Sequence, residues 1–156
     1  MTTDEIKRST PADVAALTSI ALASKKYWGY SDEQIEKWKA DLTVTEQEIE
    51  ENFVFHIERN GRIVGFYVLS ERGDTFEIEH MWVLPEHIGT GLGRALFNHA
   101  KKMAVQTGGK KLKITSDPNA EGFYLKMGLK RTGETRSSIP GRALPVLEMG
   151  LNGVVG

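Results

Sequence analysis

The segment from Met81 to Phe97 reads MWVLPEHIGTGLGRALF, an apolar strand followed by glycines at every second position and then an amphipathic helix. Gly89, Gly91 and Gly93 permit a tight backbone turn that side chains with a Cβ disfavour. Such a turn at a helix start directs several backbone N–H groups toward one point, where the helix dipole also favours negative charge. The segment therefore predicts a strand–turn–helix unit that binds a phosphate-bearing ligand.

The spacing of these glycines differs from two well-known phosphate-binding patterns. The segment lacks the lysine and hydroxyl of the P-loop, and its glycines are not spaced as in dinucleotide-binding turns. No Asp/Glu pair stands beside it to hold Mg²⁺. A pyrophosphate held by backbone amides without a metal fits better, with Arg94 in the first helical turn. A tight turn that binds nothing is the alternative interpretation.

Composition is that of an ordinary globular protein. The 156 residues are 40% hydrophobic and 26% charged, which predicts a single domain over residues 1–156. The net charge of −1 favours neither nucleic acid nor an acidic membrane surface as a partner. The absence of cysteine excludes disulfides, a thiolate nucleophile and cysteine-ligated metal. No apolar run is long enough to cross a bilayer, and we expect a cytoplasmic protein.

Hydrophobic periodicity and turn signals predict the element order β-αα-βββ-α-β-α-ββ. The expected strands cover residues 6–8, 53–58, 62–69, 75–83, 112–115, 129–134 and 144–151. The expected helices run from 11 to about 25, from 32, from 92 and over 119–127, with a helical turn at 45–52. This order implies an α/β fold with a mixed sheet, helices on its faces and one parallel strand–helix–strand unit.

Two longer patterns resemble motifs of one family. The first is Val83-x-Pro85-x-x-x-Gly89-x-Gly91-x-Gly93-Arg94, which resembles the acetyl-CoA-binding motif of the GNAT (Gcn5-related) N-acetyltransferase superfamily. The second, Ala120-x-x-Phe123-Tyr124-x-Lys126-x-Gly128-Leu129, resembles a downstream motif of that family. The resemblance covers nearly the whole chain and implies a mostly antiparallel mixed central sheet, with acetyl-CoA as co-substrate and no metal.

The resemblance also assigns residues to the coenzyme. In the family the strand before the glycines splays from its neighbour, so main-chain groups of the Met81, Trp82 and Val83 segment are expected to pair with the pantetheine arm. A fully paired strand is the alternative. The pyrophosphate is expected at Ile88, Gly89, Thr90, Gly91, Leu92, Gly93 and Arg94. Because Ile88 stands where the family usually has Gln or Arg, we expect weaker coenzyme binding.

Further contacts to the coenzyme are implied downstream. Asp117 stands where the family often has Asn, and Asn119 is expected to supply that amide. Lys126 is expected either to meet the 3′-phosphate or simply to be exposed.

Glu77 and Glu79 are candidate general bases. Strand alternation places both on one face and Ile78, His80 and Trp82 on the other. A half-buried carboxylate beside another should have a raised pKa, which suits proton transfer from an ammonium near neutrality. The family takes its base from this face, but the choice between the two stays open, as does a solvated or substrate-binding acidic face. His80 is expected to be a packed or surface histidine.

Tyr124 matches the family tyrosine that protonates the departing thiolate of coenzyme A. A phenol is a weak enough acid to stay protonated until a thiolate forms beside it. The alternative is a core aromatic next to Phe123.

Acceptor residues are expected at two places. Tyr27, Trp28 and Tyr30 fall where the first two helices meet, and there they could stack on an amine-bearing acceptor or belong to the core. Arg142, in the loop over residues 137–142, could hold an acceptor carboxylate.

The resemblance implies acetyl transfer from acetyl-CoA to a primary amine of a small molecule or peptide. Without a cysteine, direct attack in a ternary complex is the simpler route. A non-catalytic acyl-CoA-binding or sensing domain and a nucleotide-binding module are the alternatives. The last strand often builds dimers in this family, so a homodimer is a further expectation.

Overall fold

The computed structural model describes residues 3–137, 139 and 141–151. Ser138 and Pro140, which belong to the loop predicted to face the acceptor, lie outside the described residues. The strands are β1 (Asp4–Arg8), β2 (Phe53–Arg59), β3 (Arg62–Arg72), β4 (Thr75–Val83), β5 (Lys111–Thr115), β6 (Lys130–Arg136) and β7 (Ala143–Gly150). The helices are α1 (Val14–Tyr27), α2 (Asp32–Leu42), α3 (Glu46–Glu51), α4 (Leu92–Gln106) and α5 (Glu121–Lys126), with 3₁₀ turns at Pro11–Asp13, Pro85–His87 and Pro118–Ala120.

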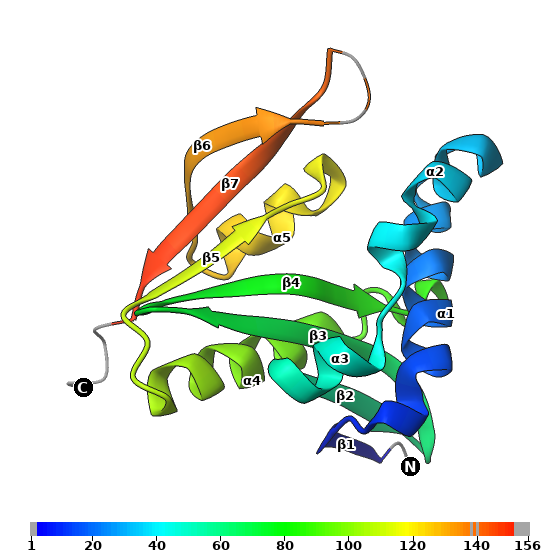
Figure 1. The fold of residues 1–156 in the computed structure, drawn as a ribbon, viewed down its shortest axis with the longest axis horizontal. Coiled ribbons are helices and arrows are strands. Elements are labelled where there is room, and N and C mark those ends of the chain that lie inside the picture. Colours follow the sequence, from blue (N-terminus) through cyan, green and yellow to red (C-terminus); the bar gives the residue numbers. More distant parts are fainter. Residues whose placement is uncertain (1–2, 138, 140, 152–156) are drawn as a thin grey trace. The chain divides into compact units, whose positions relative to one another are not determined.

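The strand order in the sheet is β1-β2-β3-β4-β5-β7-β6 (Figure 1). The described registers are antiparallel for β1–β2, β2–β3, β5–β7 and β6–β7, and parallel for β4–β5. This arrangement confirms the predicted mixed, mostly antiparallel sheet and its one parallel unit. The last strand, β7, pairs on both sides, and β6 ends the sheet.

The chain divides into two compact units that share three elements. The first unit comprises Met1–Leu69 and His80–Leu96, and the second comprises Ser70–Glu79 and Phe97–Gly156. The boundaries therefore fall inside β3, β4 and α4. The expected single domain over residues 1–156 stays a prediction. Among the described residues, no helix is long and apolar enough to cross a membrane.

In the first unit, local signals set the ends of the elements. Asp13 accepts a hydrogen bond from the Thr10 amide ahead of α1, at 2.8 Å. Asn60 and Gly61 both adopt positive φ, which closes the predicted hairpin between β2 and β3. The core of this unit includes Leu17, Ile20, Ala21, Val54, Ile57, Phe66, Val68, Leu92 and Leu96.

In the second unit, β7 lies between β5 and β6. Alternate residues of β5 are buried, whereas every residue of β6 is exposed. Gly109 is required by packing, because a Cβ there would lie 2.6 Å from the Phe76 ring. The core of this unit includes Phe76, Ile78, Phe97, Ala100, Ala104, Leu112, Tyr124 and Leu147.

Candidate functional site

The glycine segment forms the predicted turn between β4 and α4. Gly89 and Gly91 have φ of +84° and +89°, a region that L side chains rarely adopt. Between them, the Thr90 hydroxyl donates to the His87 carbonyl at 2.6 Å. Gly93 already belongs to α4. Two of the three glycines are therefore required by backbone conformation, and a Cβ built on either would meet no neighbour within 4 Å.

The start of α4 presents backbone donors beside this turn. Ala95 donates to the Gly91 carbonyl at 3.1 Å, so Leu92, Gly93 and Arg94 precede the first intrahelical bond. The first N–H groups of a helix have no acceptor within it and can bind an anion. Leu92 is buried, Arg94 is exposed and Ile88 is 44% exposed. The strand–turn–helix unit is confirmed, and its ligand stays a prediction.

The strand before the turn continues beyond its register with β5. The described β4–β5 pairs end at Glu77 and Lys113, whereas β4 runs on to Val83. Near its end, the Val83 carbonyl accepts a hydrogen bond from the buried Ser24 hydroxyl at 2.8 Å. A Cβ on Gly65 would lie 2.9 Å from the Trp82 carbonyl, so β3 approaches β4 closely here. Ser24 carried no sequence signal for this role, because its partner is 59 residues away.

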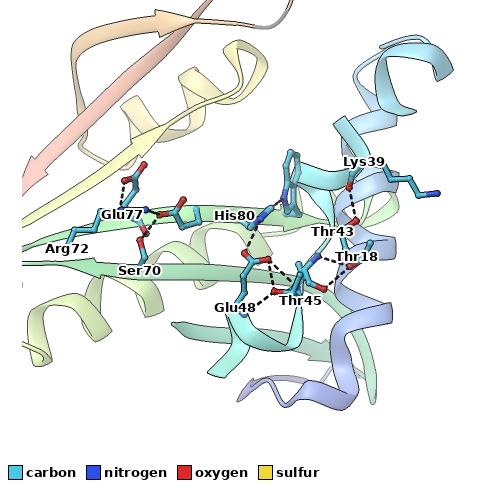
Figure 2. A network of polar contacts seen from close by, with 12 residues as sticks. Thr18, Lys39, Thr43, Thr45, Glu48, Ser70, Arg72, Glu77 and His80 are labelled. Carbon is cyan, nitrogen blue, oxygen red and sulfur yellow. Dashed lines mark hydrogen bonds and ion pairs between the residues drawn. The ribbon is translucent and has the colours of Figure 1, made fainter. Parts of the chain in front are cut away.

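His80 and Trp82 share one face of β4, as the alternation predicted. The Trp82 indole N–H donates to His80 Nδ1 at 3.1 Å, and His80 Nε2 lies 3.9 Å from a carboxylate oxygen of Glu48 (Figure 2). The other Glu48 oxygen accepts from the Thr45 amide at 3.1 Å, in the capping box that starts α3. His80 is thus a packed histidine, and Met81 between the two is half-buried.

Within the second unit, the two predicted carboxylates share one arginine. Arg72 Nε lies 3.3 Å from Glu77, and an Arg72 Nη donates to Glu79 at 3.0 Å (Figure 2). The same Glu79 oxygen accepts the Ser70 hydroxyl at 2.6 Å. The predicted common face is therefore confirmed. Neither Arg72 nor Ser70 was predicted from the sequence; both lie at the end of β3, just before the turn that leads into β4.

The environments of the two carboxylates differ. Burial raises the pKa of Glu77, and the neighbouring Glu79 charge raises it further, while Lys113 and Arg72 oppose both effects. One carboxylate oxygen of Glu79 instead accepts two hydrogen bonds, from Ser70 and Arg72. Glu77 is therefore the carboxyl that takes up a proton more readily than an ordinary glutamate.

Tyr124 lies in α5 and is 4% exposed. Its ring packs edge-on against Phe123, with centroids 5.0 Å apart, and lies 6.3 Å from the Phe97 ring. Burial raises the pKa of the phenol well above its usual value. The hydroxyl therefore stays protonated at neutral pH, as a proton donor must.

Other predicted contacts engage neighbours in the second unit. The Asn119 side-chain amide donates to Asp117 at 2.9 Å, and an Arg142 Nη lies 3.5 Å from the same carboxylate. Asp117 thus holds both residues that were expected to meet ligands. Lys126 is exposed at the end of α5.

The aromatic residues between α1 and α2 separate into two groups. Tyr27 and Trp28 are 55% and 39% exposed, with ring centroids 5.2 Å apart, so the core interpretation is wrong for both. Tyr30 is half-buried and packs edge-on against Trp38, with centroids 4.8 Å apart. The Lys25 ammonium lies over both of these rings.

Comparison with known proteins identifies a family and a curated relative. The family described as "Acetyltransferase (GNAT) domain" matches residues 28–141. The peptidyl-lysine N-acetyltransferase YjaB of Escherichia coli (strain K12) is 32% identical over 91 residues, which is 55% of this chain and 54% of that protein. The chain thus aligns with about half the length of this curated relative.

Solved structures share the fold. The PaiA N-acetyltransferase of Thermoplasma acidophilum, in complex with coenzyme A, has a TM-score of 0.80 at 22% identity, over 95% of this chain and 99% of that chain. YncA of Salmonella typhimurium, with its cofactor acetyl-CoA, has a TM-score of 0.72 at 22% identity, over 96% of this chain and 95% of that chain. At these identities the similarity shows the fold alone.

Proposed function

Because this chain belongs to the GNAT acetyltransferase family, we propose that it transfers the acetyl group of acetyl-CoA to a primary amine by direct attack in a ternary complex. The acceptor is an amine of a small molecule or peptide. The coenzyme bound in the PaiA and YncA structures supports the choice of donor.

One observation carries the proposal: β4 runs past its described register with β5 into a turn that holds two left-handed glycines and opens a 15-residue helix. Main-chain groups of Met81, Trp82 and Val83 would pair with the pantetheine arm. Backbone amides from Gly89 to Arg94, with the Arg94 side chain, would hold the pyrophosphate. The exposed side chain of Ile88 has no hydrogen-bond donor, so these amides would carry more of the affinity.

The reaction needs a base, a polarised carbonyl and an acid. A carboxylate takes a proton from the acceptor ammonium, and the free amine forms an N–C bond with the acetyl carbon. The Val83 amide polarises the carbonyl. The C–S bond breaks, its electron pair goes to sulfur, and the Tyr124 hydroxyl protonates the thiolate. The new amide nitrogen loses its extra proton, which restores the Tyr124 phenol. The place of Tyr124 in the Ala120–Leu129 motif, inside the residues that match the family, supports this assignment.

Between the two candidate bases, the environment favours Glu77. Its raised pKa brings proton uptake closer to neutrality, where a general base works best. Glu79, hydrogen-bonded to Ser70 and Arg72, would then set the charge around Glu77 and contact the acceptor.

On the acceptor side, we assign Tyr27, Trp28 and Tyr30 to contacts with the acceptor, and Arg142 to binding of an acceptor carboxylate. The exposed rings of Tyr27 and Trp28 support the first assignment. Asn119 and Lys126 remain predicted coenzyme contacts. A homodimer and a cytoplasmic location also stay predictions.

The exposed Ile88 gives specific support to a second candidate, a domain that binds acyl-CoA without catalysis. An apolar residue at the anion turn fits a weakly binding sensor as well as an enzyme. Transfer of the acetyl group is what separates these two functions.

The deciding experiment combines calorimetry with a turnover assay. Coenzyme A should bind in preference to ATP, and a panel of amines with acetyl-CoA should release free thiol. Tyr124→Phe, which keeps the ring, is the matched control and should abolish most of this release. Binding without amine-dependent thiol release would favour the sensor, and preferential binding of ATP would refute both.

A further inference from the structure

Three aromatic rings in the first unit surround one ammonium group. Lys25 Nζ, from α1, lies 4.6 Å from the ring centroid of Trp38, 5.0 Å from that of Tyr30 and 5.9 Å from that of Trp82. The rings come from α2, from the connection between α1 and α2, and from β4. We call Tyr30, Trp38 and Trp82 the aromatic cage.

The chemistry of the cage is that of a site for organic cations. The face of each ring carries negative electrostatic potential, and a cation within about 6 Å of the centroid is attracted to it. Three faces around one position select an ammonium over a neutral or anionic group. All three rings and Lys25 are half-buried, so the position is partly shielded from water yet reachable from solvent.

The rings of the cage have contacts of their own in addition to Lys25. Lys25 carries its charge on a flexible four-carbon stem, and it stands two residues before the end of α1. Tyr30 and Trp38 are held by their own edge-on contact, and Trp82 by its hydrogen bond to His80. The rings are therefore fixed by neighbours other than the lysine they surround.

We propose that the aromatic cage binds an alkylammonium group of the acceptor, and that Lys25 is an internal cation which this group displaces. The position of the cage supports the assignment. Trp82 is next to Val83, the residue proposed to polarise the thioester carbonyl, and Lys25 is next to Ser24, whose hydroxyl donates to the Val83 carbonyl. The link to the acceptor rests on the proposed function. The acceptor would present a second cationic group, separate from the amine that is acetylated.

The cage can be tested without acetyl transfer. Choline and 3,3-dimethylbutan-1-ol have the same shape and differ in charge, and neither has an amine to acetylate. Tryptophan fluorescence titration and indole N–H NMR signals should report choline binding and no binding of the neutral alcohol. Lys25→Met keeps most of the stem, removes the competing charge and should tighten choline binding roughly two- to thirty-fold.

Ring variants provide the controls. Tyr30→Phe retains the aromatic face and should bind choline like the parent, whereas Tyr30→Leu and Trp38→Leu should each weaken binding in the Lys25→Met background. Circular dichroism and melting curves identify any variant that fails to fold. Because Lys25, Tyr30 and Trp38 all lie outside β4 and the glycine turn, coenzyme A affinity should be unchanged in these variants.

Two results would overturn the inference: no choline binding by folded Lys25→Met, or equal binding of choline and the neutral alcohol. Either result with normal coenzyme A binding would leave the proposed function standing. Conversely, selective choline binding by a protein that does not bind coenzyme A would refute the proposed function and retain the cage.

Discussion

Gly91→Ala isolates the conformational requirement of the anion turn. Gly91 has φ of +89°, and an added Cβ would meet nothing within 4 Å, so the substitution adds backbone strain without a steric clash. Holding an L-residue in the left-handed region costs about 1–2 kcal/mol. For a chain of 156 residues that corresponds to a fall in melting temperature of roughly 2–8 °C.

Gly122→Ala is the matched control for this substitution. Gly122 lies in α5, where an added Cβ also meets nothing within 4 Å, but its φ lies outside the left-handed region. Alanine is the better helix former there, so this variant should be stabilised by about 0.5 kcal/mol. Gly91→Asn should fall between glycine and alanine, because Asn tolerates positive φ better than Ala does.

Thermal unfolding followed by circular dichroism measures the three variants, and calorimetry measures their coenzyme A affinity. Gly91→Ala should lose both stability and affinity, since the turn that presents the amides is strained. The reasoning is refuted if Gly91→Ala melts within 1 °C of the parent, or if its shift has the same sign and size as that of Gly122→Ala.

Four further outcomes are expected. If Glu77 is the base, activity rises with pH through its raised pKa. Glu77→Gln should remove that rise, whereas Glu79→Gln, which removes a neighbouring negative charge, should move it to lower pH. Loss of the rise in Glu79→Gln, with a shift in Glu77→Gln, would identify Glu79 as the base. The pKa of Glu77 is lower in the unfolded chain than in the fold, so protonation of Glu77 favours the folded state. This contribution to the free energy of unfolding is fully present below about pH 4.5 and is lost as the pH rises. Glu77→Gln should therefore be more stable than the parent at pH 7 but not at pH 4. Tyr124→Phe should lower kcat by about 100-fold or more with coenzyme A affinity nearly unchanged, and equal losses in both would indicate a packing role. Ser24→Ala should lower the free energy of unfolding by about 1 kcal/mol, because it removes the hydrogen bond to the end of β4. Ser19 is exposed on the same helix, so Ser19→Ala should leave stability unchanged, and equal melting temperatures of the two variants would contradict this interpretation.

Local patterns predicted most of the elements and part of the site. Period-two alternation placed Glu77 and Glu79 on one face, and alternate glycines marked a turn in which Gly89 and Gly91 are indeed left-handed. These features depend on neighbours within a few residues, so the sequence carries them directly. The helix α3 was expected only as a turn, because a six-residue segment offers too few periodic positions to distinguish the two.

Long-range contacts were not predictable in the same way. The hydrogen bond from Ser24 to Val83 and the cation position of Lys25 over Trp82 join residues more than 50 positions apart. Alternation likewise cannot say where the β4–β5 register ends, since that depends on the direction of both strands. The pairing of Asp117 with Arg142 was not predictable either, because it depends on how two loops of the second unit meet.

The exposed strand β6 has a consequence for behaviour at high concentration. As the last strand of the sheet, it offers backbone groups on which another chain could pair, a common route to aggregation. Its sequence KRTGETR has no apolar side chain and carries three basic residues against one acidic residue. A second copy laid along this edge would bring cations together and bury no apolar surface. The charged side chains that keep β6 out of the hydrophobic core therefore also oppose fibre growth along this edge. For the same reason, pairing of two β6 strands is a poor route to the expected homodimer.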